Sequence, residues 1–264
     1  MLGVGIGNPE VECLGFKQST MQIGGHTDRQ FHEVARALRI EFPVIRFHTS
    51  CEFLVAIAGG HGQIALQLGR LLSSEGSRVR GIIRNPAHAA DLEDAGVEPV
   101  VFDLEHDEDL FSVIGGADAV VFAAGAGPGS GAERKLTMDR DGAIKLVEAC
   151  RQAGVSRYVI VSSMGAKPGV TGDEGFQVYL RAKFEADEAL RASGLDFTVV
   201  RPGALTDDPG DGLISLAPEL PRGSIPRADV AATLAAILPA SNTIGKTLDL
   251  MGGETPIAEA VAAV

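Results

Sequence analysis

The sequence predicts an α/β fold in which a doubly wound parallel sheet forms one domain. Three observations predict it. Short apolar runs of strand length alternate with helical patterns from residue 53 onward, a glycine-rich loop follows the first run, and 264 residues suffice for one large core. Such alternation gives parallel βαβ units with helices on both faces. The expected strand order is 3-2-1-4-5-6, with a small C-terminal lobe.

The alternation can be followed along the chain, because apolar runs of about five residues predict buried strands and a 3.6-residue rhythm predicts helices. The expected strands are Leu54–Ala58, Arg78–Ile83, Pro99–Phe102, Ala119–Ala123, Tyr158–Val161, Phe197–Val200 and Leu248–Met251. The expected helices are Gln63–Ser74, Pro86–Ala95, Asp107–Ile114, Leu136–Ala153, Phe176–Ala192 and Ala228–Leu238, followed by a short one near Ile257–Ala262.

The loop after the first strand has the composition of a dinucleotide-binding turn. Gly59 permits a tight turn, Gly62 lets backbone N–H groups approach a pyrophosphate, and Ala65 lets the helix pack close to the strand. A chain with 33 glycines will sometimes contain this pattern by chance, so an ordinary strand-turn-helix is the alternative. The flanking strand and helix favour a nucleotide cofactor. His61 is expected to face solvent rather than to act as a base.

The residues at three further strand ends indicate which dinucleotide binds and where it lies. Arg84 ends the second strand, where an arginine can pair with the 2′-phosphate of NADP, so NADP(H) is favoured over NAD(H). A solvated surface arginine is the alternative. Asp103 could accept a hydrogen bond from adenine or could cap a turn. The small residues at 123–127 could lie along the cofactor or form a flexible loop.

The fifth strand leads into residues that suit proton transfer. Ser163 follows the strand, and Tyr179 and Lys183 lie one helical turn apart on the next predicted helix. A lysine ammonium lowers the pKa of a nearby phenol, which otherwise titrates near pH 10. Tyr179 could then exchange a proton with a substrate oxygen that Ser163 orients. Alternatively, Tyr179 and Lys183 are neighbours on a surface helix, and the serine caps a strand.

Together these motifs resemble the short-chain dehydrogenase/reductase superfamily, in particular its atypical, NAD(P)H-binding and epimerase-like branch, over about residues 53–264. The resemblance rests on Gly-Gly-His-Gly-Gln-Ile-Ala at 59–65, Arg-Asn-Pro at 84–86, Asp-Leu at 103–104, Ala-Ala-Gly at 123–125, Val-Ser-Ser at 161–163, Tyr-Leu-Arg-Ala-Lys at 179–183 and Arg-Pro-Gly at 201–203. The sequence Met-Gly at 164–165, which follows Ser163, departs from the aromatic-Gly turn of sugar epimerases.

The resemblance implies a role for each matching position. Gly59, Gly62, Gln63 and Ile64 would contact the pyrophosphate, Arg84 the 2′-phosphate, Asp103 and Leu104 the adenine, Ala124 and Gly125 the cofactor backbone, Lys183 the nicotinamide ribose, and Pro202 and Gly203 the nicotinamide. Tyr179 and Ser163 match active-site positions.

The expected activity is oxidation or reduction of a small carbonyl compound, alcohol or similar acceptor. The segment between Arg-Pro-Gly and the helix at Ala228 is short, which disfavours a large activated sugar. The acidic residues Asp207, Asp208 and Asp211 would repel a phosphorylated substrate if they faced the site, although a solvated turn is the alternative. A nucleotide-sugar epimerase or dehydratase and a non-catalytic NADP(H)-binding redox sensor are the alternative functions.

Composition limits the partners. A net charge of −12 and a pI near 4.9 disfavour nucleic acid and anionic membranes. No apolar run reaches the roughly 20 residues of a membrane span, and the three cysteines lack metal-binding or dithiol spacing. We therefore expect a cytoplasmic monomer or homodimer without a metal. Residues 1–52 differ in composition, and we expect a poorly ordered extension or a start site assigned too far upstream.

Overall fold

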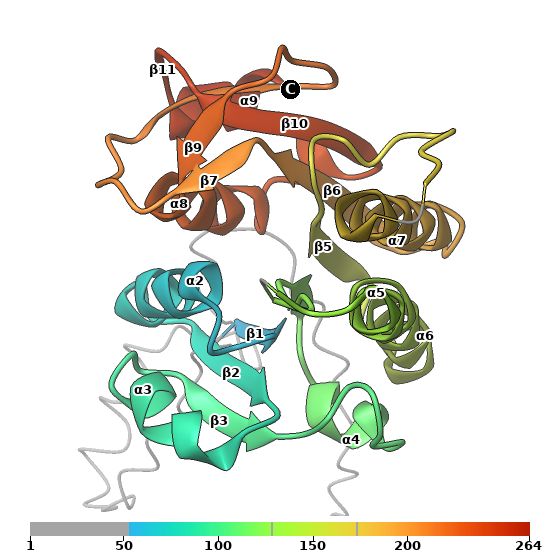
Figure 1. Cartoon of the computed structure of the whole chain (residues 1–264). Coiled ribbons are helices and arrows are strands. Elements are labelled where there is room, and N and C mark those ends of the chain that lie inside the picture. Colours follow the sequence, from blue (N-terminus) through green and yellow to red (C-terminus); the bar gives the residue numbers. More distant parts are fainter. Residues whose placement is uncertain (1–52, 128, 173) are drawn as a thin grey trace, which may run out of the picture. The chain divides into compact units, whose positions relative to one another are not determined.

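A single large sheet organises the part of the chain that the computed structural model describes, residues 53–127, 129–172 and 174–264 (Figure 1). The predicted extension at residues 1–52 lies outside these residues. The nine-stranded sheet has the order β11-β8-β10-β6-β5-β4-β1-β2-β3. The strands are β1 (Leu54–Ala58), β2 (Arg78–Ile83), β3 (Glu98–Val101), β4 (Ala119–Phe122), β5 (Arg157–Val161), β6 (Asp196–Pro202), β8 (Leu213–Ala217), β10 (Lys246–Gly252) and β11 (Thr255–Pro256).

The predicted strand order is confirmed. The first six strands pair in parallel in the order 3-2-1-4-5-6, and β10 extends the parallel part beside β6. β8 runs antiparallel to β10 and to β11, so the C-terminal residues extend the main sheet. A separate parallel pair, β7 (Ala204–Thr206) with β9 (Ser224–Pro226), completes the C-terminal lobe. The switch between β1 and β4 is the point at which this class of sheet binds ligands.

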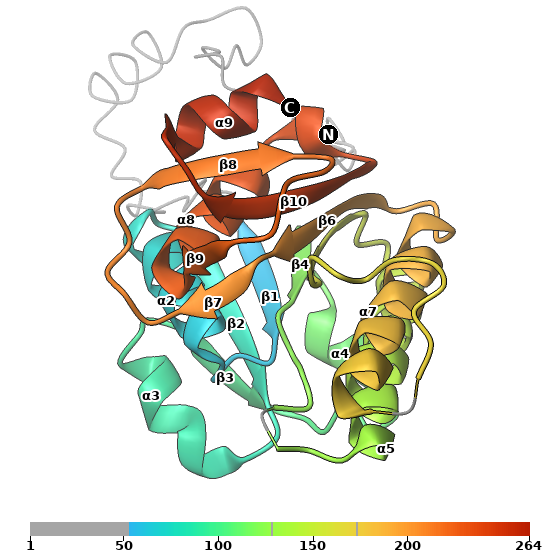
Figure 2. The ribbon, with the colours of Figure 1, turned by 45° about the horizontal axis from the view of Figure 1, so that its top comes forward.

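Helices cover both faces of the sheet (Figures 1 and 2). α2 (Gln63–Ser74) and α8 (Arg227–Ile237) contact one another on one face, with α9 (Ile257–Ala263) beside α8. α4 (Leu110–Ile114), α6 (Ala143–Ala153) and α7 (Gly175–Arg191) lie on the other. The strands between them are buried on both sides, which explains why β1, β4 and β5 are almost continuously apolar.

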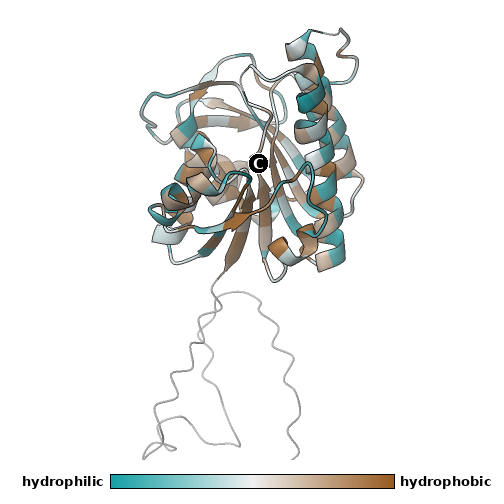
Figure 3. Cartoon of the chain, turned by 60° about the horizontal axis from the view of Figure 1, so that its bottom comes forward, coloured by the Kyte–Doolittle hydropathy of each residue, from teal (hydrophilic) through white to brown (hydrophobic). Residues whose placement is uncertain are grey.

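The hydrophobic residues form two clusters, one on each face of the sheet. Val55, Leu68 and Leu234 belong to the cluster under α2 and α8, whereas Val120 and Leu146 belong to the cluster under α6 and α7. Figure 3 shows the strands as mainly hydrophobic and the outer helical surfaces as largely hydrophilic. Among the described residues, no helix is both long and apolar enough to cross a membrane.

The structure corrects several predicted boundaries. The single helix expected over residues 136–153 is two segments, a π-helical segment η2 (Lys135–Gly142) and α6, and the short helix α5 (Ala132–Arg134) precedes them. The helix expected over residues 86–95 begins as the 3₁₀ turn η1 (Pro86–His88), which Asn85 caps, and continues as α3 (Ala89–Glu93). A last 3₁₀ turn, η3 (Ser241–Thr243), precedes β10. The strands β7, β8, β9 and β11 were missed because they are short and depend on partners distant in sequence.

Candidate functional site

The loop after β1 fits tightly between the ends of neighbouring strands. Gly59 adopts φ +80°, and a Cβ atom there would lie 2.6 Å from the Cα of Ala124 at the end of β4. A Cβ on Gly60 would lie 2.8 Å from the Cα of Gly81 in β2. The Gly62 N–H donates to the Gly59 carbonyl at 2.8 Å and closes the turn. Glycine is therefore required by both conformation and space, as the sequence predicts for Gly59.

The N-terminus of α2 has donors available for an anion. Gly62 is its N-cap in an extended conformation, and no side chain of the described residues caps the helix. The first turn also contains no acidic residue. Ala65 is buried and lets α2 pack against the sheet. Uncapped N–H groups at the positive end of a helix dipole are a favourable site for a phosphate group.

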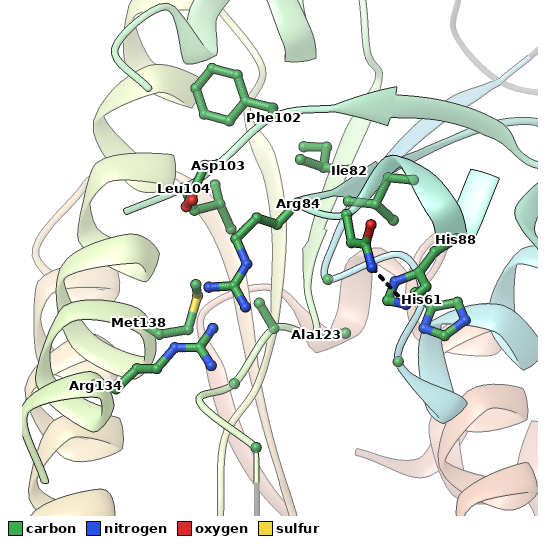
Figure 4. A pocket seen from close by; sticks show the side chains of 17 residues that line it. His61, Ile82, Arg84, His88, Phe102, Asp103, Leu104, Ala123, Arg134 and Met138 are labelled. Carbon is green, nitrogen blue, oxygen red and sulfur yellow. Dashed lines mark hydrogen bonds between the residues drawn. The ribbon is translucent and has the colours of Figure 1, made fainter. Parts of the chain in front are cut away.

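A cavity of about 440 Å³ lies along the carboxyl ends of β1, β2, β3 and β4 (Figure 4). Seven of the predicted cofactor residues line it: Gly59, Gly62, Arg84, Asp103, Leu104, Ala124 and Gly125. Phe102, Met138 and Ile82 add apolar surface, as the adenosine half of a dinucleotide requires.

Arg84 reaches over this cavity toward Arg134 (Figure 4). Its Nη1 lies 3.3 Å from Oε2 of Glu105, and the Nε of Arg134 lies at the same distance from that oxygen. The other carboxylate oxygen, Oε1, accepts a hydrogen bond from Thr137 at 2.5 Å. Glu105 thus holds two guanidinium groups at the edge of the cavity. Sequence reasoning missed Glu105 and Arg134, because they lie 29 residues apart in predicted loops.

Asp103 is engaged within its own turn. Oδ1 accepts the Glu105 N–H at 2.9 Å, and Oδ2 lies 3.1 Å from Nδ1 of His106. Burial raises the pKa of Asp103, but these hydrogen bonds and the nearby Arg84 outweigh burial and bring the pKa below its usual value. The alternative of a turn aspartate is therefore present in the structure, and the contact with adenine stays a prediction.

His61 does not simply face solvent. Its ring stacks on that of His88 with centroids 3.6 Å apart, and its Nε2 lies 2.8 Å from Oδ2 of Asp91. Both imidazoles line the cavity on the side of the glycine loop (Figure 4). Sequence reasoning missed His88, which stands four residues after Arg84.

A second cavity of about 590 Å³ continues from the first. The two share Ala123, Ala124, Gly125 and Gly127 in their linings. The second contains the remaining predicted residues, namely Ile64, Ser163, Tyr179, Lys183, Pro202 and Gly203. Of all the predicted site residues, Gln63 is the one outside both linings. The fold thus brings together strand ends separated by more than a hundred residues.

Lys183 is buried beneath this second cavity. Its Nζ lies 3.2 Å from Oδ1 of Asp139, and it donates to the carbonyls of Val161 and Ala124 at 3.2 and 3.4 Å. The same atom lies 5.8 Å from the centre of the Tyr179 ring. Burial alone lowers the pKa of Lys183, but the acidic groups of Tyr179 and Asp139 outweigh burial and raise the pKa above its ordinary value. The ammonium is therefore charged at neutral pH.

Asp139 is a site residue that the sequence analysis missed. It is fully buried in the π-helical segment η2, and its Oδ2 accepts the Ala126 N–H at 3.1 Å. π-Helical turns often mark functional positions, because they turn a side chain away from the regular helical face. The sequence contains one signal, an acidic residue directly after the apolar Met138 in a segment patterned for burial.

The two serines after β5 have different environments. Ser162 is buried and donates to Oδ2 of Asp187 at 2.9 Å, and Arg201 donates to the same oxygen from Nε and Nη2. Burial raises the pKa of Asp187, although Arg201 acts in the opposite direction. Ser163 is half-buried, lines the cavity, and its hydroxyl makes no hydrogen bond within the described residues. Ser163, rather than Ser162, is therefore available to a ligand.

Comparison with known proteins identifies the family. Residues 59–241 match the family described as NAD(P)H-binding, and this range spans the glycine loop, the residues that line both cavities, and all of α8. The chain belongs to the NAD(P)H-binding family. This membership agrees with the resemblance drawn from the motifs, and with a mostly parallel sheet whose strands end at a continuous pair of cavities.

Individual proteins are similar to this chain over most of its length. The Bacillus subtilis protein named "Uncharacterized sugar epimerase YhfK" is 40% identical over 209 residues, covering 78% of this chain and 98% of that protein. A putative NAD-dependent epimerase/dehydratase from Bacillus halodurans has 35% identity and a TM-score of 0.76, with 80% of this chain and 100% of that chain covered. The oxidoreductase ylbE from Lactococcus lactis has 28% identity and a TM-score of 0.70, with 80% and 96% covered.

Proposed function

We propose that this protein is an NADP(H)-dependent oxidoreductase that interconverts a small carbonyl compound and the corresponding alcohol. One observation carries the proposal. The cavity beside the glycine loop continues, through the shared residues at the end of β4, into a cavity lined by Tyr179, Ser163 and Lys183. A cofactor that extends along both would have its reactive end next to a candidate proton donor.

The residues fit a dinucleotide. We assign the pyrophosphate to Gly59, Gly62, Gln63 and Ile64 at the start of α2, since that helix end has no cap of its own among the described residues. Arg84 is assigned to the 2′-phosphate, Asp103 and Leu104 to the adenine, Ala124 and Gly125 to the cofactor backbone, Lys183 to the nicotinamide ribose, and Pro202 with Gly203 to the nicotinamide.

NADP(H), when bound, supplies or accepts the hydride. The chain itself handles the proton. In reduction, the carbonyl carbon gains the hydride with its electron pair, and the Tyr179 hydroxyl gives its proton to the carbonyl oxygen. Ser163 donates a hydrogen bond to the same oxygen. The Lys183 ammonium, kept charged by Asp139, stabilises the negative charge left on the tyrosine oxygen.

The names of two similar proteins favour one alternative, an epimerase or dehydratase. Such an enzyme would use the same residues with a tightly held cofactor. It is distinguished by NAD(P) that co-purifies with the protein and by the absence of net NADPH consumption with any carbonyl compound.

Tyr179→Phe tests the proposal. Removing a general acid is expected to lower turnover by about 10²- to 10⁴-fold, while the calorimetric Kd for NADPH stays unchanged. Tyr158→Phe is a matched control, because the other tyrosine is fully buried and its hydroxyl donates to the Ala143 carbonyl at 3.3 Å. Unchanged turnover in Tyr179→Phe would remove the catalytic role and favour a cofactor-binding sensor.

Arg84→Ala tests the cofactor preference. Loss of a charge-assisted bond to a phosphate is worth about 1.5 to 3 kcal/mol, so the Kd for NADPH should rise roughly 10- to 100-fold. The Kd for NADH should change by less than threefold. Arg70→Ala, on the exposed surface of α2, is the control for loss of one positive charge. Equal weakening of NADPH and NADH would contradict the assignment of Arg84.

A further inference from the structure

The nicotinamide-side cavity opens outward into a third hollow of about 660 Å³. The two share Ser163, Phe176, Tyr179, Leu205 and Arg227, together with Pro202 and Gly203. A substrate whose reacting oxygen lies beside Tyr179 and Ser163 would therefore extend into this outer hollow. The rest of its lining indicates which kind of substrate that is.

The charges on the lining are opposite to the charge of the whole protein. Lys135, Arg222 and Arg227 line the two connected cavities. The acidic residue among the lining residues is Asp139, which is buried and paired with Lys183. A protein with a net charge of −12 thus presents positive side chains at this opening. A concave positive surface concentrates anionic ligands and orients them.

Among these cations, Arg222 has the most hydrogen-bond donors without an acceptor. It is exposed, and it forms no hydrogen bond or ion pair within the described ranges. Arg227, at the start of α8, pairs with the exposed Asp207 at 2.7 Å. Lys135 is held by the carbonyl and hydroxyl oxygens of Ser130 at 2.8 and 3.1 Å. A guanidinium without a partner matches the geometry of a carboxylate, which it can bind through two parallel hydrogen bonds.

The acidic loop offsets the charge of Arg227 but not the charges of Arg222 and Lys135. Asp207 contacts Arg227, and Oδ1 of Asp211 accepts the Leu213 N–H at 2.9 Å within its own turn. Asp207, Asp208 and Asp211 are all absent from the linings of the two cavities. The alternative of a solvated turn therefore fits the position of this loop, because its acidic residues do not line the cavities in which they would repel a phosphorylated substrate.

The remaining wall is apolar and open to solvent. Phe176 is 64% exposed and Leu205 is 38% exposed, although both are large hydrophobic residues, and both line the two cavities. The Phe176 ring lies 6.1 Å from the Tyr179 ring. Exposed apolar side chains gathered beside a reactive group favour an apolar body in the ligand, because its binding removes their surface from water.

We propose that the substrate is an apolar or aromatic carbonyl compound that carries a carboxylate, with Arg222 binding the carboxylate and Phe176 and Leu205 packing against the body. This inference rests on the proposed function and specifies its substrate class. A nucleotide sugar fits less well, because the outer hollow offers apolar surface where sugar hydroxyls would need polar partners.

The test uses two pairs of compounds of similar shape, in which a carboxylate is replaced by a neutral carboxamide. NADP⁺-saturated protein is titrated by calorimetry with 4-(hydroxymethyl)benzoate and with the neutral 4-(hydroxymethyl)benzamide. NADPH-saturated protein is assayed for reduction of 4-carboxybenzaldehyde and 4-carbamoylbenzaldehyde. We expect the acid to bind about tenfold more tightly than the amide, because a charge-assisted hydrogen bond to a guanidinium contributes about that much. We expect the same order in kcat/KM.

Arg222→Gln is expected to bring the two Kd values within threefold of one another by weakening the acid alone. Arg70→Gln removes the same charge from the surface of α2 and should preserve the difference. If NADPH itself does not bind, the proposed function fails and this inference falls with it. If NADPH binds but the acid binds no more tightly than the amide, this inference alone is overturned. Tighter binding of uridine diphosphate glucose than of the acid would replace the carboxylate with a diphosphate.

Discussion

A buried positive charge lies near each end of strand β5, and the two charges have different partners. Arg157 begins the strand, and its guanidinium donates five hydrogen bonds to neutral acceptors. These are the carbonyls of Asp196, Ile237 and Leu238 and the hydroxyls of Thr198 and Thr243. Lys183 lies beneath the other end, where it pairs with one carboxylate and borders an open cavity.

The carboxyl end also retains unused hydrogen-bonding capacity. Among the described residues, the buried side-chain oxygens without a hydrogen-bond partner are Oε1 of Gln177, Oδ1 of Asp187 and Oγ1 of Thr206, together with Oδ1 of Asp139, whose contact is the ion pair with Lys183. They lie on η2, α7 and β7, the elements whose residues line the second cavity and its outer hollow. Native proteins seldom leave such groups unpaired without a reason. At the amino end of β5 the buried guanidinium is thus fully hydrogen-bonded, whereas the carboxyl end borders the cavities and retains buried oxygens without a hydrogen-bond partner.

The largest effect should come from Arg157→Met. Burial lowers the pKa of Arg157 to about 10, so the guanidinium remains charged at neutral pH. Its loss would leave several buried acceptors unpaired, and we expect the free energy of unfolding to fall by about 3 to 5 kcal/mol. Urea unfolding measures this, with Arg70→Met on the exposed face of α2 as a control. A loss below about 1 kcal/mol would mean that water satisfies these acceptors.

Variants of the Lys183–Asp139 ion pair, at the carboxyl end of β5, should separate an effect on stability from an effect on turnover. Lys183→Met leaves the buried Asp139 carboxyl without its cationic partner, which should cost about 3 kcal/mol of stability and abolish turnover. Adding Asp139→Leu replaces the pair with apolar side chains and should restore stability to within about 1 kcal/mol of the original. Turnover should stay lost. Recovery of turnover in the double variant would contradict the role of the Lys183 ammonium.

We expect a smaller effect on stability from alanine substitutions at two glycines with positive φ. Gly59 lies at the carboxyl end of β1, whereas Gly76 (φ +89°) lies in the turn that leads to the amino end of β2. An added Cβ meets nothing within 4 Å at Gly76 but lies 2.6 Å from a backbone atom at Gly59. Gly76→Ala should therefore cost about 1 kcal/mol and leave NADPH binding intact. Gly59→Ala should cost about 1 to 3 kcal/mol more and weaken NADPH binding at least tenfold. Equal NADPH affinity in both variants would remove the phosphate-loop assignment.

Much of the parallel sheet and its cofactor edge could be predicted, because those signals are local. An apolar run such as Leu54–Ala58 is buried on both faces, and the glycine loop and Arg84 follow directly from strand ends. The short C-terminal strands could not be predicted in the same way. In β8 only Ile214 is buried and the other residues are half-buried, so the strand has no alternating pattern, and its conformation depends on pairing with β10, which lies more than thirty residues away.

The sequence alone determined the order of the motifs, the strand order of the parallel part, and the residue types available at each strand end. Tertiary structure decided which of these residues meet. It separated Ser162, bonded to Asp187, from Ser163, which faces the cavity, and it brought Asp139 under Lys183 and Glu105 between two arginines. The physical reason is the distance along the chain over which each interaction acts. Propensity and periodicity act over one strand or one helical turn, whereas the pairing of buried charges depends on packing between elements that are distant along the chain.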